Sequence, residues 1–134
     1  MTSFFLDSNI SVYAFDSGTP AKQVIAQKLL GQVPVISSQV LIETYLACLK
    51  KLKLAPAVCQ DNILFLCDLG VVVALDATAF GVASQVRQRY SFSFLDSLIV
   101  SSALLAGCIT LYSEDLQNGL VVDEKLTIVN PFAS

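Results

Sequence analysis

The sequence has no histidine and no tryptophan among its 134 residues, and its four cysteines never stand in a C-x-x-C pair. Without histidine the chain has no Ser-His or Cys-His nucleophile and no imidazole general base. Without paired cysteines it has no zinc-ligand spacing, so the thiols are predicted to be structural. If the protein is a hydrolase, carboxylates and a bound metal ion must therefore carry the chemistry.

Charged residues are also scarce, at 14% of the chain, and the formal net charge is −3. This balance argues against a protein that binds nucleic acid over a broad basic face. Five of the eight basic residues form two clusters, which are Lys50, Lys51 and Lys53, and Arg87 and Arg89. Local contacts with nucleic acid therefore stay open.

No apolar run is long enough to cross a membrane. The longest uncharged stretch, residues 97–113, holds four serines and a glycine, whereas a span needs about 20 mostly apolar residues. The first residues, MTSFFLD, contain no basic segment, so we expect no signal peptide and a cytoplasmic location. The hydrophobic content of 54% and the mean hydropathy of +0.67 favour association with a partner protein.

Short apolar runs alternate with helix-forming segments along the whole chain. Strands are predicted at residues 4–6, 33–36, 71–75, 109–112 and 125–129, and helices at residues 10–15, 21–30, 39–52, 56–66, 77–89 and 95–106. This alternation predicts one three-layer α/β domain over residues 1–134, with a five-stranded, mainly parallel sheet flanked by helices.

The patterns also predict which parts of these elements are buried. The valine-rich run at 71–75 is expected to be the clearest buried strand, and the run at 125–129 an edge strand. The helix at 39–52 is expected to bury an apolar stripe that consists of Leu41, Tyr45, Cys48 and Leu52.

Four acidic side chains are predicted to meet at one edge of this sheet. Asp7 follows the first strand, Glu43 lies on the helix after the second, Asp96 lies in the first turn of a helix, and Asp115 follows the fourth strand. Taken one at a time, a helix cap, a turn or plain solvent exposure explains each acid. Taken together, their mutual repulsion calls for a cation, and such oxygen ligands suit Mg²⁺ or Mn²⁺.

Two neutral residues extend the predicted site. Asn9 and Ser113 each stand two residues from an acid, where they could orient a carboxylate or a metal-bound water. The nearby acids Asp76, Glu114 and Asp123 are left out, because loop or capping roles explain them.

Four blocks of sequence surround the four acids. They are FFLDSNISVYAFD, SSQVLIETY, SFLDSLIVSSALLAGC and LYSEDLQNG. In this order they resemble the PIN-domain family, most of all its small VapC-like members, which are the toxins of type II toxin-antitoxin pairs. The resemblance covers essentially the whole chain.

The resemblance implies a sheet in the strand order 3-2-1-4-5 and a metal-dependent endoribonuclease that hydrolyses RNA phosphodiester bonds. Asp7, Glu43, Asp96 and Asp115 would be catalytic and would hold one or two Mg²⁺ or Mn²⁺ ions, and Ser113 matches the family's hydroxyl residue before the fourth acid. It also implies a homodimer and a small antitoxin protein that inhibits the enzyme.

A lysine could assist such a site. Lys50 shares the helical side of Glu43 and could contact an RNA phosphate, or it could only complement the dipole at the end of its helix. Two other functions stay open: a non-catalytic PIN-fold interaction module, and an RNA-processing nuclease without a toxin role. A dehalogenase-like or receiver domain fits poorly, because the D-x-N at Asp7 and Asn9 lacks a second aspartate and no lysine follows a late strand.

Overall fold

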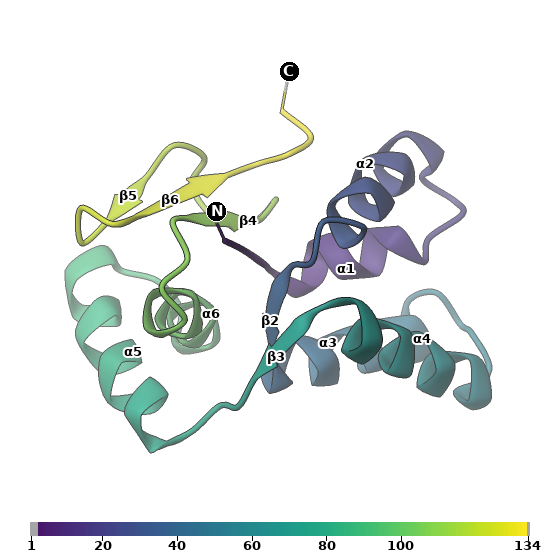
Figure 1. The fold of residues 1–134 in the computed structure, drawn as a ribbon, viewed down its shortest axis with the longest axis horizontal. Coiled ribbons are helices and arrows are strands. Elements are labelled where there is room, and N and C mark those ends of the chain that lie inside the picture. The colour runs from purple at the N-terminus through teal and green to yellow at the C-terminus, as the bar shows by residue number, and fades with distance from the viewer. Residues whose placement is uncertain (1–2, 134) are drawn as a thin grey trace.

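The computed structural model describes residues 3–133 as six strands and six helices. The strands are β1 (Phe4–Leu6), β2 (Val35–Ser37), β3 (Val71–Val73), β4 (Thr110–Tyr112), β5 (Val121–Val122) and β6 (Leu126–Val129). The helices are α1 (Ser8–Ala14), α2 (Pro20–Leu30), α3 (Ser38–Lys50), α4 (Pro56–Leu69), α5 (Ala77–Tyr90) and α6 (Phe94–Leu105). Helices α5 and α6 cover one face of the sheet, and α1 to α4 lie on the other (Figure 1). The predicted three-layer α/β fold is confirmed.

The sheet has the strand order β3-β2-β1-β4-β6-β5. Every neighbouring pair is parallel except β5 and β6, and Phe5 of β1 stands between Val35 of β2 and Leu111 of β4. The expected order of five parallel strands is therefore confirmed. The short β5 is an addition that the sequence patterns did not predict, and it moves the last long strand away from the edge.

Polar side chains begin four of the helices, three of which follow strands. Asp7, Ser37, Asp76 and Ser93 are the N-caps of α1, α3, α5 and α6, and each side chain accepts a hydrogen bond from a backbone N–H in the first turn. Such caps satisfy N–H groups that have no partner within the helix. The site at the strand ends is thus also where the helices start.

The expected burial of β3 is wrong. Val71 is 51% exposed and Val72 is 40% exposed, because β3 is the outermost strand and pairs only with β2. The core lies instead around the inner strands, where Phe5, Ile36, Leu111 and Ile128 are fully buried. Valine-rich runs form edge strands as well as central ones, so the apolar run alone does not show whether a neighbouring strand covers it.

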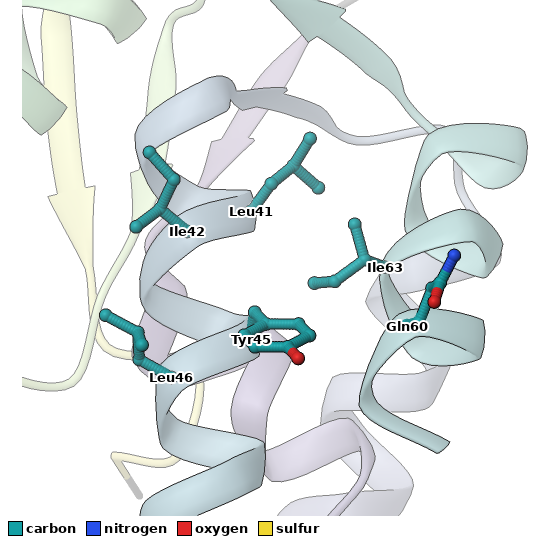
Figure 2. Close-up of a pocket in the computed structure, with 6 residues that line it drawn as sticks. All are labelled: Leu41, Ile42, Tyr45, Leu46, Gln60 and Ile63. Atoms are coloured by element: carbon teal, nitrogen blue, oxygen red, sulfur yellow. The ribbon is translucent and has the colours of Figure 1, made fainter. Parts of the chain in front are cut away.

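The buried face of α3 also differs from the predicted stripe. Val40, Thr44 and Cys48 are buried, whereas Leu41 and Tyr45 are only half-buried. Figure 2 shows why, since these two side chains point toward Ile63 of α4 across a cavity of about 350 Å³. Leu41 and Tyr45 therefore lie between two helices, and Leu41 packs against the edge of the core.

No helix within residues 3–133 is long and apolar enough to span a lipid bilayer.

Candidate functional site

The centre of the site is the end of β1. This strand lies between β2 and β4; the chain leaves β1 toward β2 and leaves β4 toward β5 and β6, so the connections from these two neighbouring strands lead to opposite halves of the sheet. The backbone N–H of Asp7 continues the β1–β4 pairing by donating to the carbonyl of Tyr112, at 3.0 Å. Ser113, the residue after β4, is thereby aligned beside Asp7. Ligands of open α/β folds bind at such a switch in strand order.

The Asp7 carboxylate is buried, with 5% of the residue exposed. Its Oδ1 accepts from the backbone N–H of Ser8 at 2.7 Å, and its Oδ2 accepts from the Ser113 hydroxyl at 2.9 Å and from the Asn9 amide at 3.3 Å. A buried carboxylate needs such donors, because it has lost the hydrogen bonds of water.

Asn9 and Ser113 connect Asp7 to Asp115. The amide nitrogen of Asn9 donates to Oδ2 of Asp115 at 3.1 Å, and its carbonyl oxygen accepts from the backbone N–H of Glu114 at 3.2 Å. The Ser113 hydroxyl oxygen also accepts from the N–H groups of Asp115 and Leu116, both at 3.3 Å. These contacts fix the loop after β4 against the start of α1.

Glu43 reaches the same centre from α3. The hydroxyl of Ser8 donates to Oε1 of Glu43 at 2.9 Å and also lies 3.4 Å from Oδ1 of Asp7, so it links the two acids. Gln39 donates to Oε2 of Glu43 at 3.4 Å and to the carbonyl of Leu95 at 3.0 Å. The Gln39 amide therefore ties α3 to the start of α6.

Asp96 lies in the first turn of α6 and is half-buried. Its backbone N–H donates to the Ser93 hydroxyl at 3.1 Å, as the capping pattern predicts. Its carboxylate is close enough for its charge to act on Asp7. The four predicted acids thus surround one region, with Asp7, Asp115 and Glu43 joined through Asn9, Ser113 and Ser8.

Burial raises the pKa of Asp7 from 3.8 to about 6. The hydrogen bonds from Ser113 and Ser8 lower the pKa, but the charges of Glu43 and Asp96 raise it further. Desolvation and neighbouring negative charge both disfavour an ionised carboxylate. The centre of the site therefore carries more negative charge than the surrounding protein compensates.

The ligand chemistry of this centre fits a hard divalent cation. Its donors are carboxylate, amide and hydroxyl oxygens, which Mg²⁺ and Mn²⁺ prefer, and the raised pKa of Asp7 marks a buried charge that a cation would compensate. Within residues 3–133, however, no three Asp, Glu, Cys or His side chains are arranged to hold one ion. The carboxylates of Glu43 and Asp115 instead accept hydrogen bonds from Ser8 and Asn9.

A cavity of about 190 Å³ opens beside the acids. The acidic residues that line it are Glu43, Glu114 and Asp115, and the remaining lining residues are Ser8, Asn9, Val12, Tyr13, Ala47 and Lys51. Lys50, the lysine predicted from the sequence, is exposed and is not among them. The lysine beside the acids is its neighbour, Lys51.

Glu114 has a role that its sequence position did not indicate. Its carboxylate forms an ion pair with Lys22 and accepts from the Tyr13 hydroxyl at 2.6 Å. Burial raises the pKa of Glu114, but the hydrogen bonds from Lys22 and Tyr13 outweigh it and hold the pKa below its usual value. Lys22 also lies over the rings of Tyr13 and Phe132, at 4.8 and 5.3 Å from their centroids. Tyr13 and Glu114 of this cluster also line the cavity.

Comparison with known proteins assigns the fold to a family. The sequence model of the PIN domain matches residues 4–117, and the chain therefore belongs to the PIN-domain family. This confirms the resemblance seen in the four acidic blocks.

The similar solved structures are toxins and toxin-antitoxin complexes. The chain is 19% identical to VapC20 of Mycobacterium tuberculosis, described as a sarcin-ricin loop cleaving toxin, with a TM-score of 0.69 over 84% of this chain and 90% of that one. It is 16% identical to a chain of a toxin-antitoxin complex from Klebsiella pneumoniae, with a TM-score of 0.71 over 98% of both. It is 18% identical to a chain of VapBC2 from Rickettsia felis, bound to a DNA fragment from their promoter, with a TM-score of 0.70 over 96% of this chain and 100% of that one. The search of curated proteins gave no match.

Proposed function

We propose that this chain is a metal-dependent endoribonuclease and acts as the toxin of a toxin-antitoxin pair. The observation that carries the proposal is the buried Asp7, whose pKa is raised to about 6, at the switch in strand order, with the charges of Glu43 and Asp96 close to it. A scaffold has no physical need for such a cluster, because uncompensated buried charge lowers stability. The PIN-domain fold and the toxins that share it support the same function.

Each polar residue has a separate task in this proposal. Asp7, Glu43, Asp96 and Asp115 would hold Mg²⁺ or Mn²⁺. When bound, such an ion makes water a better nucleophile and stabilises the charge that develops on the phosphodiester. Asn9 and Ser113 orient the carboxylates of Asp7 and Asp115 through the hydrogen bonds described above.

The partner proteins are part of the proposal. An antitoxin is supported by the toxin-antitoxin complexes that share this fold. A homodimer is supported by large exposed apolar side chains around a cavity of about 480 Å³ between α3, α5 and α6, which include Ile42, Leu46, Phe80, Phe94 and Leu95. Apolar patches of this kind on a protein surface mark sites of association.

The test is cleavage of structured RNAs by purified protein with Mn²⁺ or Mg²⁺. We expect cleavage that EDTA abolishes and that Asp96→Asn abolishes without a change in the folded structure. Asp61→Asn, the same chemical change at an exposed position on α4, is the matched control and should cleave normally. Full activity of Asp96→Asn would contradict the proposed site. No cleavage by folded, inhibitor-free protein would instead favour the non-catalytic interaction module.

A further inference from the structure

If the proposed function holds, the acidic centre has to bind RNA, which is itself a polyanion. The carboxylates that would hold a cation also repel the phosphates of an approaching RNA strand. The chain has a net charge of −3 and only eight basic residues, so attraction has to come from a few well-placed cations. Lysine and arginine contacts to phosphate position nucleic acid without reading its sequence.

Lys51 is the cationic side chain that lines the cavity beside the acids. It follows Glu43 and Ala47 at intervals of four residues, and all three line this cavity. Rows of residues spaced by four form the ridges along which helices pack. Lys51 is the C-cap of α3, and its backbone N–H donates to the carbonyl of Ala47 at 2.8 Å. The row of Glu43 and Ala47 on the helix surface therefore extends to Lys51.

Lys50 belongs to a different row of α3. It follows Ile42 and Leu46 at the same spacing, and those two side chains line the apolar cavity toward α5 and α6. Counting 100° per residue places Lys50 on the side of Glu43, but α1 packs along the row that ends at Lys51. The two neighbouring lysines therefore have the same charge and different surroundings.

The other cation near the cavity is already paired. Lys22 forms the ion pair with Glu114, lies 3.3 Å from the Tyr13 hydroxyl, and lies over two aromatic rings. Among residues 3–133 the ion pairs are Lys22 with Glu114 and Arg89 with Asp123, and neither includes Lys51. The Nζ of Lys51 is 6.0 Å from the Tyr13 centroid, and its charge is close enough to help lower the pKa of Glu114.

We propose, on the basis of the proposed function, that Lys51 binds a phosphate of the RNA strand next to the acidic centre. Lys51 lines the cavity that Glu43 and Asp115 also line, and its Nζ is 6.0 Å from the ring centroid of Tyr13 in the same lining, so a phosphate held there lies beside the acids. Tyr13 and Glu114 line the same cavity, and the ion pair with Glu114 keeps Lys22 from competing for the same phosphate. Lys51 is thus a substrate-positioning residue.

The experiment measures binding and not cleavage. A fluorescent single-stranded RNA is titrated with the full chain carrying Asp96→Asn, in Mg²⁺ and at several salt concentrations, and the fluorescence anisotropy gives Kd. We expect Lys51→Ala to weaken binding about tenfold, the usual size of one charge-assisted contact. The slope of log Kd against log salt should fall by about 0.7, as it does when one phosphate contact to a single strand is lost.

Lys50→Ala is the matched control, because it removes the same charge one residue away. It should change Kd less than about twofold, since a solvated surface charge contributes little. Lys51→Arg should keep most of the affinity and the salt slope. Because Lys51 is exposed and outside these ion pairs, the thermal stability of all variants should match that of the parent.

The outcomes separate this inference from the proposed function. Equal losses in Lys50→Ala and Lys51→Ala, or an unchanged salt slope in Lys51→Ala, would overturn the role of Lys51 while leaving the nuclease intact. If RNA binding depends on Lys51 but the wild-type protein never cleaves RNA, the proposed nuclease function is wrong and the phosphate site stands. If no variant and no wild-type protein binds RNA, both are wrong.

Discussion

Replacing Asp7 with asparagine should remove the pH dependence that this buried carboxylate imposes on folding. The pKa of Asp7 is raised from 3.8 to about 6 in the folded protein. A group with a raised pKa in the folded state contributes full stability below its unfolded pKa, and that contribution is lost as the pH rises through the folded pKa. Two pKa units correspond to about 3 kcal/mol. The metal-free wild type should therefore lose about 2 to 3 kcal/mol from this residue between pH 4 and pH 8.

The assay is urea unfolding of wild type and Asp7→Asn in EDTA across this pH range. At low pH the protonated acid resembles the amide, so any lost hydrogen bond to Ser8 or Ser113 appears as a constant offset. The free energy of unfolding of Asp7→Asn, relative to wild type, should then rise by about 2 to 3 kcal/mol toward pH 8. Asp61→Asn on the exposed face of α4 is the control for a general charge effect.

Mn²⁺ makes the same experiment a test of the metal site. At 100 times its Kd, a ligand that binds only the folded state adds about 2.7 kcal/mol. Wild type should gain this stability at pH 8 and lose it below about pH 5, where protons compete for Asp7, while Asp7→Asn should gain little. A relative stability of Asp7→Asn that stays flat from pH 4 to pH 8 would refute the electrostatic reasoning. Equal stabilisation of both proteins by Mn²⁺ would refute Asp7 as a ligand.

Two further predictions concern the hydroxyl beside Asp7 and the association of the chain. Ser113→Ala removes a donor to Asp7 and an acceptor for two backbone N–H groups, so the free energy of unfolding at pH 7 should fall by about 1 to 3 kcal/mol. Ser84→Ala, at an exposed position on α5, is the control. An equal loss of stability in Ser84→Ala would contradict the reasoning. The isolated chain should sediment as a dimer at micromolar concentration, and Ile42→Lys should shift it toward monomer while the similarly exposed Val24→Lys does not. A small protein encoded beside this chain should copurify with it, and a monomer without such a companion would count against both partners.

Local chemistry made much of the fold predictable. Pro20 at the start of α2, and Ser93 and Asp76 as caps, are signals that act within one turn of a helix. These features depend on neighbours in sequence, so a single chain displays them. The order of the strands, by contrast, was implied by the resemblance of the four acidic blocks to one family.

The errors lie where burial depends on distant parts of the chain. The valines of β3 form an apolar run, but whether a further strand covers them is decided by the topology of the whole sheet. The hairpin of β5 and β6 was missed because its three-residue connection, residues 123–125, contains no glycine, although Asp123 and Glu124 have positive φ angles of 51° and 59°. Arg89 pairs with Asp123 at 2.8 Å and Tyr90 donates to it at 3.2 Å, and these contacts support the turn from α5.

The predicted site shows the same division. Asp7 and Asp115 were found because strand ends of a parallel sheet meet at one edge, which is a property of the fold class. Ser8 stands next to Asp7 in the sequence, yet its link to Glu43 spans 35 residues, and the contact of Tyr13 with Glu114 spans 101. Sequence patterns therefore locate the charges, while the side chains that restrain those charges become visible only when α1, α3 and the loop after β4 are placed together. In the proposed metal site, Ser8 and Asn9 would compete with the ion for the carboxylate oxygens of Glu43 and Asp115, so these two residues bear on the proposed metal affinity as the acids do.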